Sequence, residues 1–169
     1  MMVLSIIVLL LSLIIQGTAL NYMGYIYTDL SWLSTIYLLV AFLVLRPYFE
    51  NEKKYLILLI IFGLIIDIVY TNTFIFNTCL FVLIYYFSKA FHFFFPYNVI
   101  TLNISSLLGV FIYHIISFIF LTILNYDNYT IGVLLKILSH SILMTIIYTS
   151  LVYFITNFFK EKFDLREVK

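Results

Sequence analysis

The fold class of this protein is indicated by one stretch of its sequence, VITLNISSLLGVFIYHIISFIFLTIL, at residues 99–124. The stretch contains no Asp, Glu, Lys or Arg, and it is longer than the roughly 20 apolar residues that a helix needs to cross the hydrocarbon core of a bilayer. Its apolar residues do not alternate with polar ones as they would in a membrane β-strand. The stretch therefore predicts a transmembrane helix.

The composition of the whole chain agrees with this prediction. Hydrophobic residues make up 64% of the 169 residues and charged residues only 10%, and the mean hydropathy is +1.14. A soluble domain has about 25% charged residues, so the composition excludes a soluble enzyme domain and a disordered protein. A net charge of +1 without a basic block excludes a nucleic-acid binder. The single cysteine, Cys79, excludes an internal disulfide and a thiolate metal cluster.

Before and after this stretch, the chain contains five further apolar runs, at residues 2–20, 30–45, 55–70, 74–91 and 133–159. We therefore predict an all-α protein, a single domain of six transmembrane helices, followed by a tail at 160–169 that is too short to fold alone. The first run lacks a basic segment before it and a small-residue cleavage site after it, so we expect a span and not a signal peptide.

The basic residues predict the orientation of the six spans. If the N-terminus is cytoplasmic, eight of the nine basic residues lie on the cytoplasmic side. These eight are Arg46, Lys53, Lys54, Lys89, Lys160, Lys162, Arg166 and Lys169. The connections on the opposite side contain Asp29 and Asp127 and no Lys or Arg. We therefore expect a multi-pass protein of the cell membrane with both termini in the cytoplasm.

Four ionisable side chains fall inside the predicted spans, where each is energetically costly. Asp67 and Lys136 lie near the outer ends of the third and sixth spans, so we expect them at similar depth and paired. His140 lies one helical turn from Lys136, and His114 lies past the middle of the fifth span. Several alternatives stay open: Lys136 extends to the outer surface, and the histidines are hydrogen-bonded packing residues. Asp67 is a protonated or water-exposed residue at the helix end, or, if it is not paired, it caps the Thr71–Thr73 turn or contacts a partner directly.

Two helix faces contain the other polar residues of interest. One, in the fifth span, comprises Asn103, Ser106, Val110, His114 and Ser117, and the other, in the fourth span, comprises Asn77, Phe81, Ile84 and Ser88. Together with Asp67 and Lys136 they suggest an outward-facing polar cluster lined by spans three, five and six. No zinc-protease or serine-hydrolase motif is present, and His114 and Ser117 are neighbours on one helix without an oxyanion hole. We predict that the protein is not an enzyme and has no cofactor.

Four short motifs, in order along the chain, resemble one known family. The segment LIIQGT, which contains Gln16, ends the first span, and Asp29-Leu30 begins the second. Arg46-Pro47 ends the second span, and the third contains GLIID, which ends at Asp67 and is followed by a polar stretch that reaches Asn77. This order resembles MreD, the rod-shape-determining membrane protein family. The chain departs from the family pattern at Thr28, where the family has proline, and in lacking a Gly-x-x-Gly between helices three and four.

The resemblance implies a non-enzymatic scaffold of the cell-wall elongation complex, which helps to maintain cell shape. It implies MreC as the direct partner, with MreB, RodA and a penicillin-binding transpeptidase in the larger complex, contact with membrane lipids and none with nucleic acid. The family is similar in fold to the vitamin-binding S components of energy-coupling-factor transporters, which supply the alternative function. Such proteins dock through alanines spaced by three, whereas the alanines here, Ala19, Ala41 and Ala90, are far apart.

Overall fold

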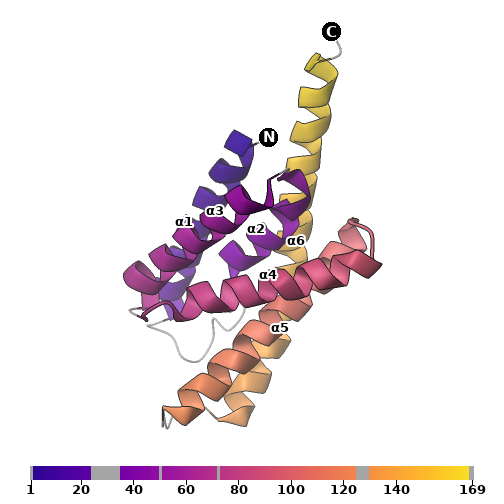
Figure 1. Ribbon diagram of the computed structural model, residues 1–169. Coiled ribbons are helices and arrows are strands. Elements are labelled where there is room, and N and C mark those ends of the chain that lie inside the picture. Colours follow the sequence, from indigo (N-terminus) through magenta and orange to yellow (C-terminus); the bar gives the residue numbers. More distant parts are fainter. Residues whose placement is uncertain (1, 24–34, 50, 72, 125–129, 168–169) are drawn as a thin grey trace.

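A computed structural model of the protein describes residues 2–23, 35–49, 51–71, 73–124 and 130–167 (Figure 1). Within these ranges every regular element is helical, which confirms the all-α prediction. The elements are α1 (Met2–Met23), α2 (Tyr37–Leu45), η2 (Arg46–Tyr48), α3 (Glu52–Ile65), η3 (Ile66–Thr71), α4 (Phe76–Phe94), α5 (Val99–Ile123) and α6 (Ile131–Glu167). The segment η2 is a 3₁₀ turn and η3 is a π-helical turn that continues α3.

Three helical segments in the described residues are long and apolar enough to cross a membrane: Glu52–Thr71, Val99–Ile123 and Ile131–Lys162. They correspond to the third, fifth and sixth predicted spans. Leu4–Thr18 and Tyr37–Tyr48 are shorter apolar helices. The first, second and fourth predicted spans therefore remain predictions, and the start of the second lies outside the described residues.

Helix α2 is the centre of the structure. All nine of its residues are buried, and α1, α4, α5 and α6 all contact it. Its sequence, YLLVAFLVL, contains no charged side chain and thus has no strongly polar face. A helix that is hydrophobic on all sides is stable only when it is surrounded by other parts of the protein or by lipid. In this fold the surrounding elements are other helices of the same chain.

Polar residues and prolines mark the helix boundaries. The side chain of Asn51 accepts hydrogen bonds from the backbone N–H groups of Lys53 and Lys54 and so caps α3. Asn98 caps α5 through a reciprocal pair of hydrogen bonds with Thr101. Such caps satisfy the N–H groups that lack partners in the first turn of a helix.

The first residues of the predicted C-terminal tail continue the last helix. Helix α6 runs without interruption to Glu167, past the expected span end at residue 159. No Gly or Pro follows Phe159 to stop the helix. The side chains of Asn157 and Glu161, one turn apart, form a hydrogen bond of 2.9 Å that supports the continuation.

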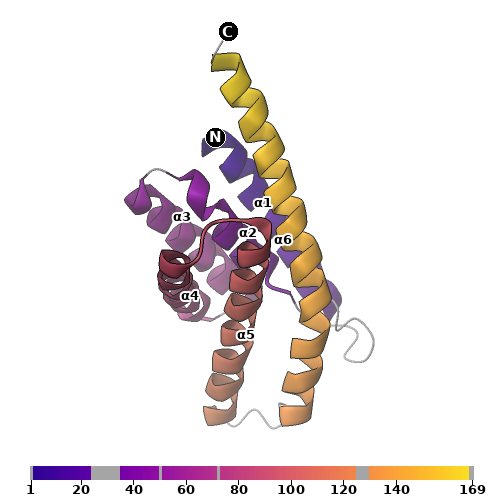
Figure 2. The same cartoon turned by 90° about the vertical axis from the view of Figure 1, so that its right-hand side faces the viewer.

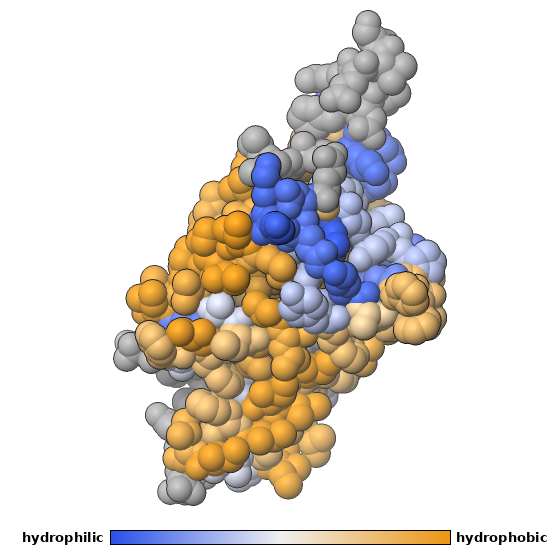
Figure 3. All heavy atoms as spheres, in the orientation of Figure 1, coloured by the Kyte–Doolittle hydropathy of each residue, from blue (hydrophilic) through white to orange (hydrophobic). Residues whose placement is uncertain are grey.

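The two ends of the chain lie at the same end of the molecule. Figures 1 and 2 show the start of α1 and the end of α6 at the top, with η2 near them, and the α5–α6 hairpin reaching the opposite end. Figure 3 shows hydrophilic residues gathered toward the upper part of one face, while the remainder of that face is largely hydrophobic. The fold thus separates a hydrophilic end from an apolar body.

Candidate functional site: a buried network around Asp67

Asp67 lies in the π-helical turn η3 and is almost completely buried, with 1% of its surface exposed. Its carboxylate accepts five hydrogen bonds. One oxygen accepts from the hydroxyl of Thr73 at 2.7 Å and from the backbone and side-chain nitrogens of Asn77, both at 2.9 Å. The other accepts from the backbone nitrogen of Thr78 at 2.9 Å and from its hydroxyl at 2.7 Å. These donors explain how a carboxylate is accommodated inside an apolar helix bundle.

The same carboxylate caps helix α4. Ile75 occupies the N-cap position, where its apolar side chain makes no capping hydrogen bond. The N–H groups of Asn77 and Thr78 lie in the first turn of α4 and have no acceptor within the helix. Asp67 supplies that acceptor from the preceding helix, and its negative charge is favourable at a helix N-terminus. Asp67 therefore connects the end of α3–η3 to the start of α4.

Asn77 extends the network to a third helix. Its side-chain nitrogen also donates to the hydroxyls of Thr71 and Thr73, at 2.9 and 3.1 Å. Its side-chain oxygen accepts a hydrogen bond from the hydroxyl of Tyr113 on α5. The network thus connects η3, α4 and α5, and all of its donors except Tyr113 belong to residues 73–78.

Gly63 lies one helical turn before Asp67 and allows α3 and α4 to approach closely. A Cβ atom at this position would lie 2.9 Å from the hydroxyl oxygen and 3.0 Å from the Cα of Thr78. Since backbone atoms set the second distance, a larger residue would force the two helices apart. The GLIID motif therefore combines a residue that permits close contact with one that forms hydrogen bonds across it.

Ile75 is the only residue other than glycine with a positive φ in the described part of the chain, at φ 64° and ψ −1°. A β-branched residue is strained in this left-handed region by roughly 1–2 kcal/mol, whereas glycine adopts it freely. We expect Ile75→Gly to raise the free energy of unfolding by about 1 kcal/mol, as measured by thermal unfolding in detergent. Ile75→Ala, which keeps the Cβ, is the control, and equal stability of the two variants would contradict this assignment of strain.

The predicted ion pair between Asp67 and Lys136 is not formed in the described residues, where the ion pair present is Lys89–Glu52. Lys136 lies on α6, which packs against α5, α2 and α1, and its side chain is exposed. Asp67 instead faces the start of α4. The two residues were matched by depth along their spans, but depth does not specify which neighbouring helix a side chain faces.

The structure also changes the composition of the predicted polar cluster. Asn77 and the three other residues of its predicted face, Phe81, Ile84 and Ser88, are all buried, which confirms that face. His114, on α5, is half-buried, and its ring lies edge-on to that of Tyr113 at 5.6 Å. His140, on α6, contacts the backbone oxygen of Lys136 at 2.7 Å. The network around Asp67 is therefore formed by η3, α4 and α5, and none of the hydrogen bonds described for it comes from α6.

Two further candidates have less defined surroundings. Gln16 is buried on α1 with 3% of its surface exposed, and its side-chain oxygen has no hydrogen-bond partner in the described part of the structure. Next to it, Gly17 contacts the ring of Tyr70 in η3, so this part of α1 lies beside the π-helical turn. Asp29 lies outside the described residues.

Arg46 lies in a second cluster, at the end of α2. Its guanidinium carbon lies 5.8 Å from the ring centre of Tyr55 and 5.9 Å from that of Tyr85, both distances typical of cation–π contacts. The hydroxyl of Tyr85 and the ammonium of Lys89 donate to one oxygen of Glu52, at 2.7 and 2.5 Å. This cluster connects η2, α3 and α4 and places three charged side chains at one end of the bundle.

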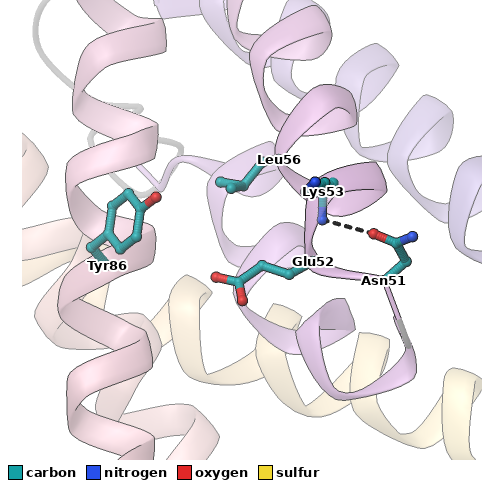
Figure 4. Close-up of a pocket in the computed structure, with 5 residues that line it drawn as sticks. All are labelled: Asn51, Glu52, Lys53, Leu56 and Tyr86. Carbon is teal, nitrogen blue, oxygen red and sulfur yellow. Dashed lines mark hydrogen bonds between the residues drawn. The ribbon is translucent and has the colours of Figure 1, made fainter.

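Beside this cluster, an open depression of about 670 Å³ lies between α3 and α4. It is lined by Asn51, Glu52, Lys53, Leu56 and Tyr86. Figure 4 shows Tyr86 on α4 facing the α3 residues across it. Among the described residues, no group of three or more His, Cys, Asp or Glu side chains is arranged to hold a metal ion.

Sequence reasoning missed several residues of both clusters. Thr78 and Tyr113 complete the network of Asp67, and Tyr55 and Tyr85 surround Arg46. Thr73, which also bonds to Asp67, lies in the turn that the sequence offers this residue as an alternative partner. Thr78 has a signal in the sequence, because it directly follows Asn77. The three tyrosines have no such signal in the sequence. Tyr occurs 15 times in this chain, and the sequence around these three does not distinguish them from the others.

Comparisons of the chain with protein-family models, with curated proteins and with solved structures found no match.

Proposed function

We propose that this protein is a non-enzymatic membrane scaffold of the cell-wall elongation complex that spans the membrane six times and binds MreC. MreB, RodA and a penicillin-binding transpeptidase are its further partners in the larger complex. The proposal starts from the resemblance of the ordered motifs to the MreD family. The structure adds the observation that supports it most directly, which is the environment of Asp67.

Asp67 ends the GLIID motif, and its carboxylate accepts five hydrogen bonds from Thr73, Asn77 and Thr78. A carboxylate with five donors around it is suited to holding helices together, not to binding a ligand or transferring a proton. Neither the depression between α3 and α4 nor the groove between α1 and α6 includes Asp67, Lys136 or His114 in its lining. These features support a structural role over that of a vitamin-binding S component.

The test is a crosslinked pull-down that uses the MreC homologue of the same cell as bait. We expect the full chain to be captured. A chain that lacks residues 160–169 should be captured nearly as well, because the basic end mainly sets the orientation in the membrane. Complete loss of capture on this deletion would assign the tail a direct role in binding, and failure to capture the folded full chain would overturn the proposal. In the second case, binding of a water-soluble vitamin to the purified protein would favour the S component.

The proposed orientation is tested by cysteine labelling in a chain whose own Cys79 is replaced by alanine. Single cysteines at positions 28 and 128 should react with a membrane-impermeant maleimide in intact cells, because their connections contain no basic residue. A cysteine in place of Lys53 is the matched cytoplasmic control and should react only after permeabilisation. The reverse pattern would show that the orientation is wrong.

A further inference from the structure

An apolar groove of about 620 Å³ runs between α1 and α6. Its floor consists of Val8, Tyr148 and Val152, which are at most 9% exposed, and its walls include Leu11 and Leu151, which are each about half exposed. Tyr148 lines the groove, and its hydroxyl forms a 2.7 Å hydrogen bond with Ser12. The groove therefore offers hydrocarbon and aromatic surface and is suited to an apolar occupant.

The volume of the groove indicates the size of that occupant. At roughly 30 Å³ for each non-hydrogen atom, 620 Å³ holds about 20 such atoms. The α1 side of the groove extends from Leu4 to Ile15, a length of about 17 Å in an α-helix. A helix of this length and about 10 Å across would need roughly twice the available volume. A single hydrocarbon chain therefore fits wholly within the groove, whereas a transmembrane helix would leave about half of its volume outside it.

The charge at one end of the groove indicates the rest of the ligand. Phe159 lines the groove near the end of α6, and Lys162 follows three residues later on the same helix face. The side chain of Lys160 is also exposed, and its ammonium lies 5.9 Å from the ring centre of Tyr48. Both cations thus lie within one helical turn of Phe159, Lys162 on the helix face of the groove and Lys160 on the neighbouring face toward Tyr48. Positive charge at this end of an apolar groove is complementary to an anionic headgroup with an attached acyl chain.

We infer that the groove between α1 and α6 binds one acyl chain of an anionic phospholipid whose headgroup lies beside Lys160 and Lys162. The inference goes beyond the scaffold function and requires only that these helices lie in a membrane. Its failure is therefore distinguishable from failure of the MreC pull-down.

Native mass spectrometry of the detergent-solubilised full chain tests the inference. Phosphatidylglycerol and phosphatidylcholine with the same palmitoyl and oleoyl chains are the two probes. We expect one phosphatidylglycerol molecule to be retained more strongly than phosphatidylcholine. Leu151→Trp, which fills the groove, should abolish retention, whereas Leu143→Trp, at an equally exposed α6 position that does not line the groove, should leave it unchanged.

The double substitution Lys160→Gln and Lys162→Gln tests the headgroup contact at two exposed positions. It should weaken retention of phosphatidylglycerol by roughly fivefold for each lysine removed and leave that of phosphatidylcholine unchanged. The control, Lys53→Gln with Lys54→Gln, removes the same charge at positions away from the groove. Equal retention of both lipids by every variant would overturn the inference. A dimer of the wild-type chain that Leu151→Trp dissociates would also overturn it, because the groove would then be a protein interface.

Discussion

Replacing Asp67 with asparagine is expected to destabilise the protein by about 3 kcal/mol or more, because a buried donor left without its acceptor costs about 1–3 kcal/mol. Each carboxylate oxygen accepts at least two hydrogen bonds. Whichever oxygen becomes an NH₂ group, at least one backbone N–H, of Asn77 or of Thr78, then faces another donor. The substitution also removes the negative charge from the N-terminus of α4. The measurement is thermal unfolding in detergent together with the yield of folded protein.

Double-mutant cycles separate this explanation from the ion pair that the sequence suggested. The effects of Asp67→Asn and Thr78→Ala should be strongly non-additive, because the two side chains share a hydrogen bond. The effects of Asp67→Asn and Lys136→Met should be additive. Recovery of stability in the second double variant would show that the carboxylate and the ammonium interact after all. Asn103→Ala, which removes a half-buried amide bonded to Ser150 at 3.3 Å, is a control for loss of an ordinary polar contact.

The second large effect is expected at Gly63. The substitution Gly63→Ala should lower the free energy of unfolding by about 2 kcal/mol, within the range for an extra methyl group in a packed interior. The added Cβ would lie 3.0 Å from the Cα of Thr78, so the backbones of α3 and α4 must separate. This separation would also stretch the hydrogen bonds from Thr78 to Asp67.

Gly132→Ala provides the matched control in the same measurement. Among the described residues, a Cβ at Gly132, in the first turn of α6, would have only the hydroxyl oxygen of Thr130 within 4 Å, at 3.8 Å. Alanine favours a helix over glycine by up to about 1 kcal/mol, so this variant should be as stable as the wild type or more so. If the two alanine variants have the same stability, close approach at Gly63 does not contribute to the fold.

The sequence alone was sufficient to predict the helical class and most helix positions. Uninterrupted apolar runs such as residues 99–124 predict helices because the backbone polar groups of a membrane span must be satisfied within the segment. The shared face of Asn77 and Ser88 also followed from helical periodicity, which is a local property. The end of α6 was harder to predict, because polar residues after Phe159 are compatible both with a separate tail and with a continuing helix.

The partner of Asp67 was decided only by the tertiary structure. The position of a residue along its span indicates only its depth in the membrane. Asp67 and Lys136 have similar predicted depths, although they lie on helices that pack against different neighbours. The π-helical turn, the left-handed Ile75 and the close contact at Gly63 together bring the start of α4 to the carboxylate. Each of these features depends on how two helices meet. Hydropathy determines which segments become helices, whereas the packing of their side chains determines which polar groups can reach one another.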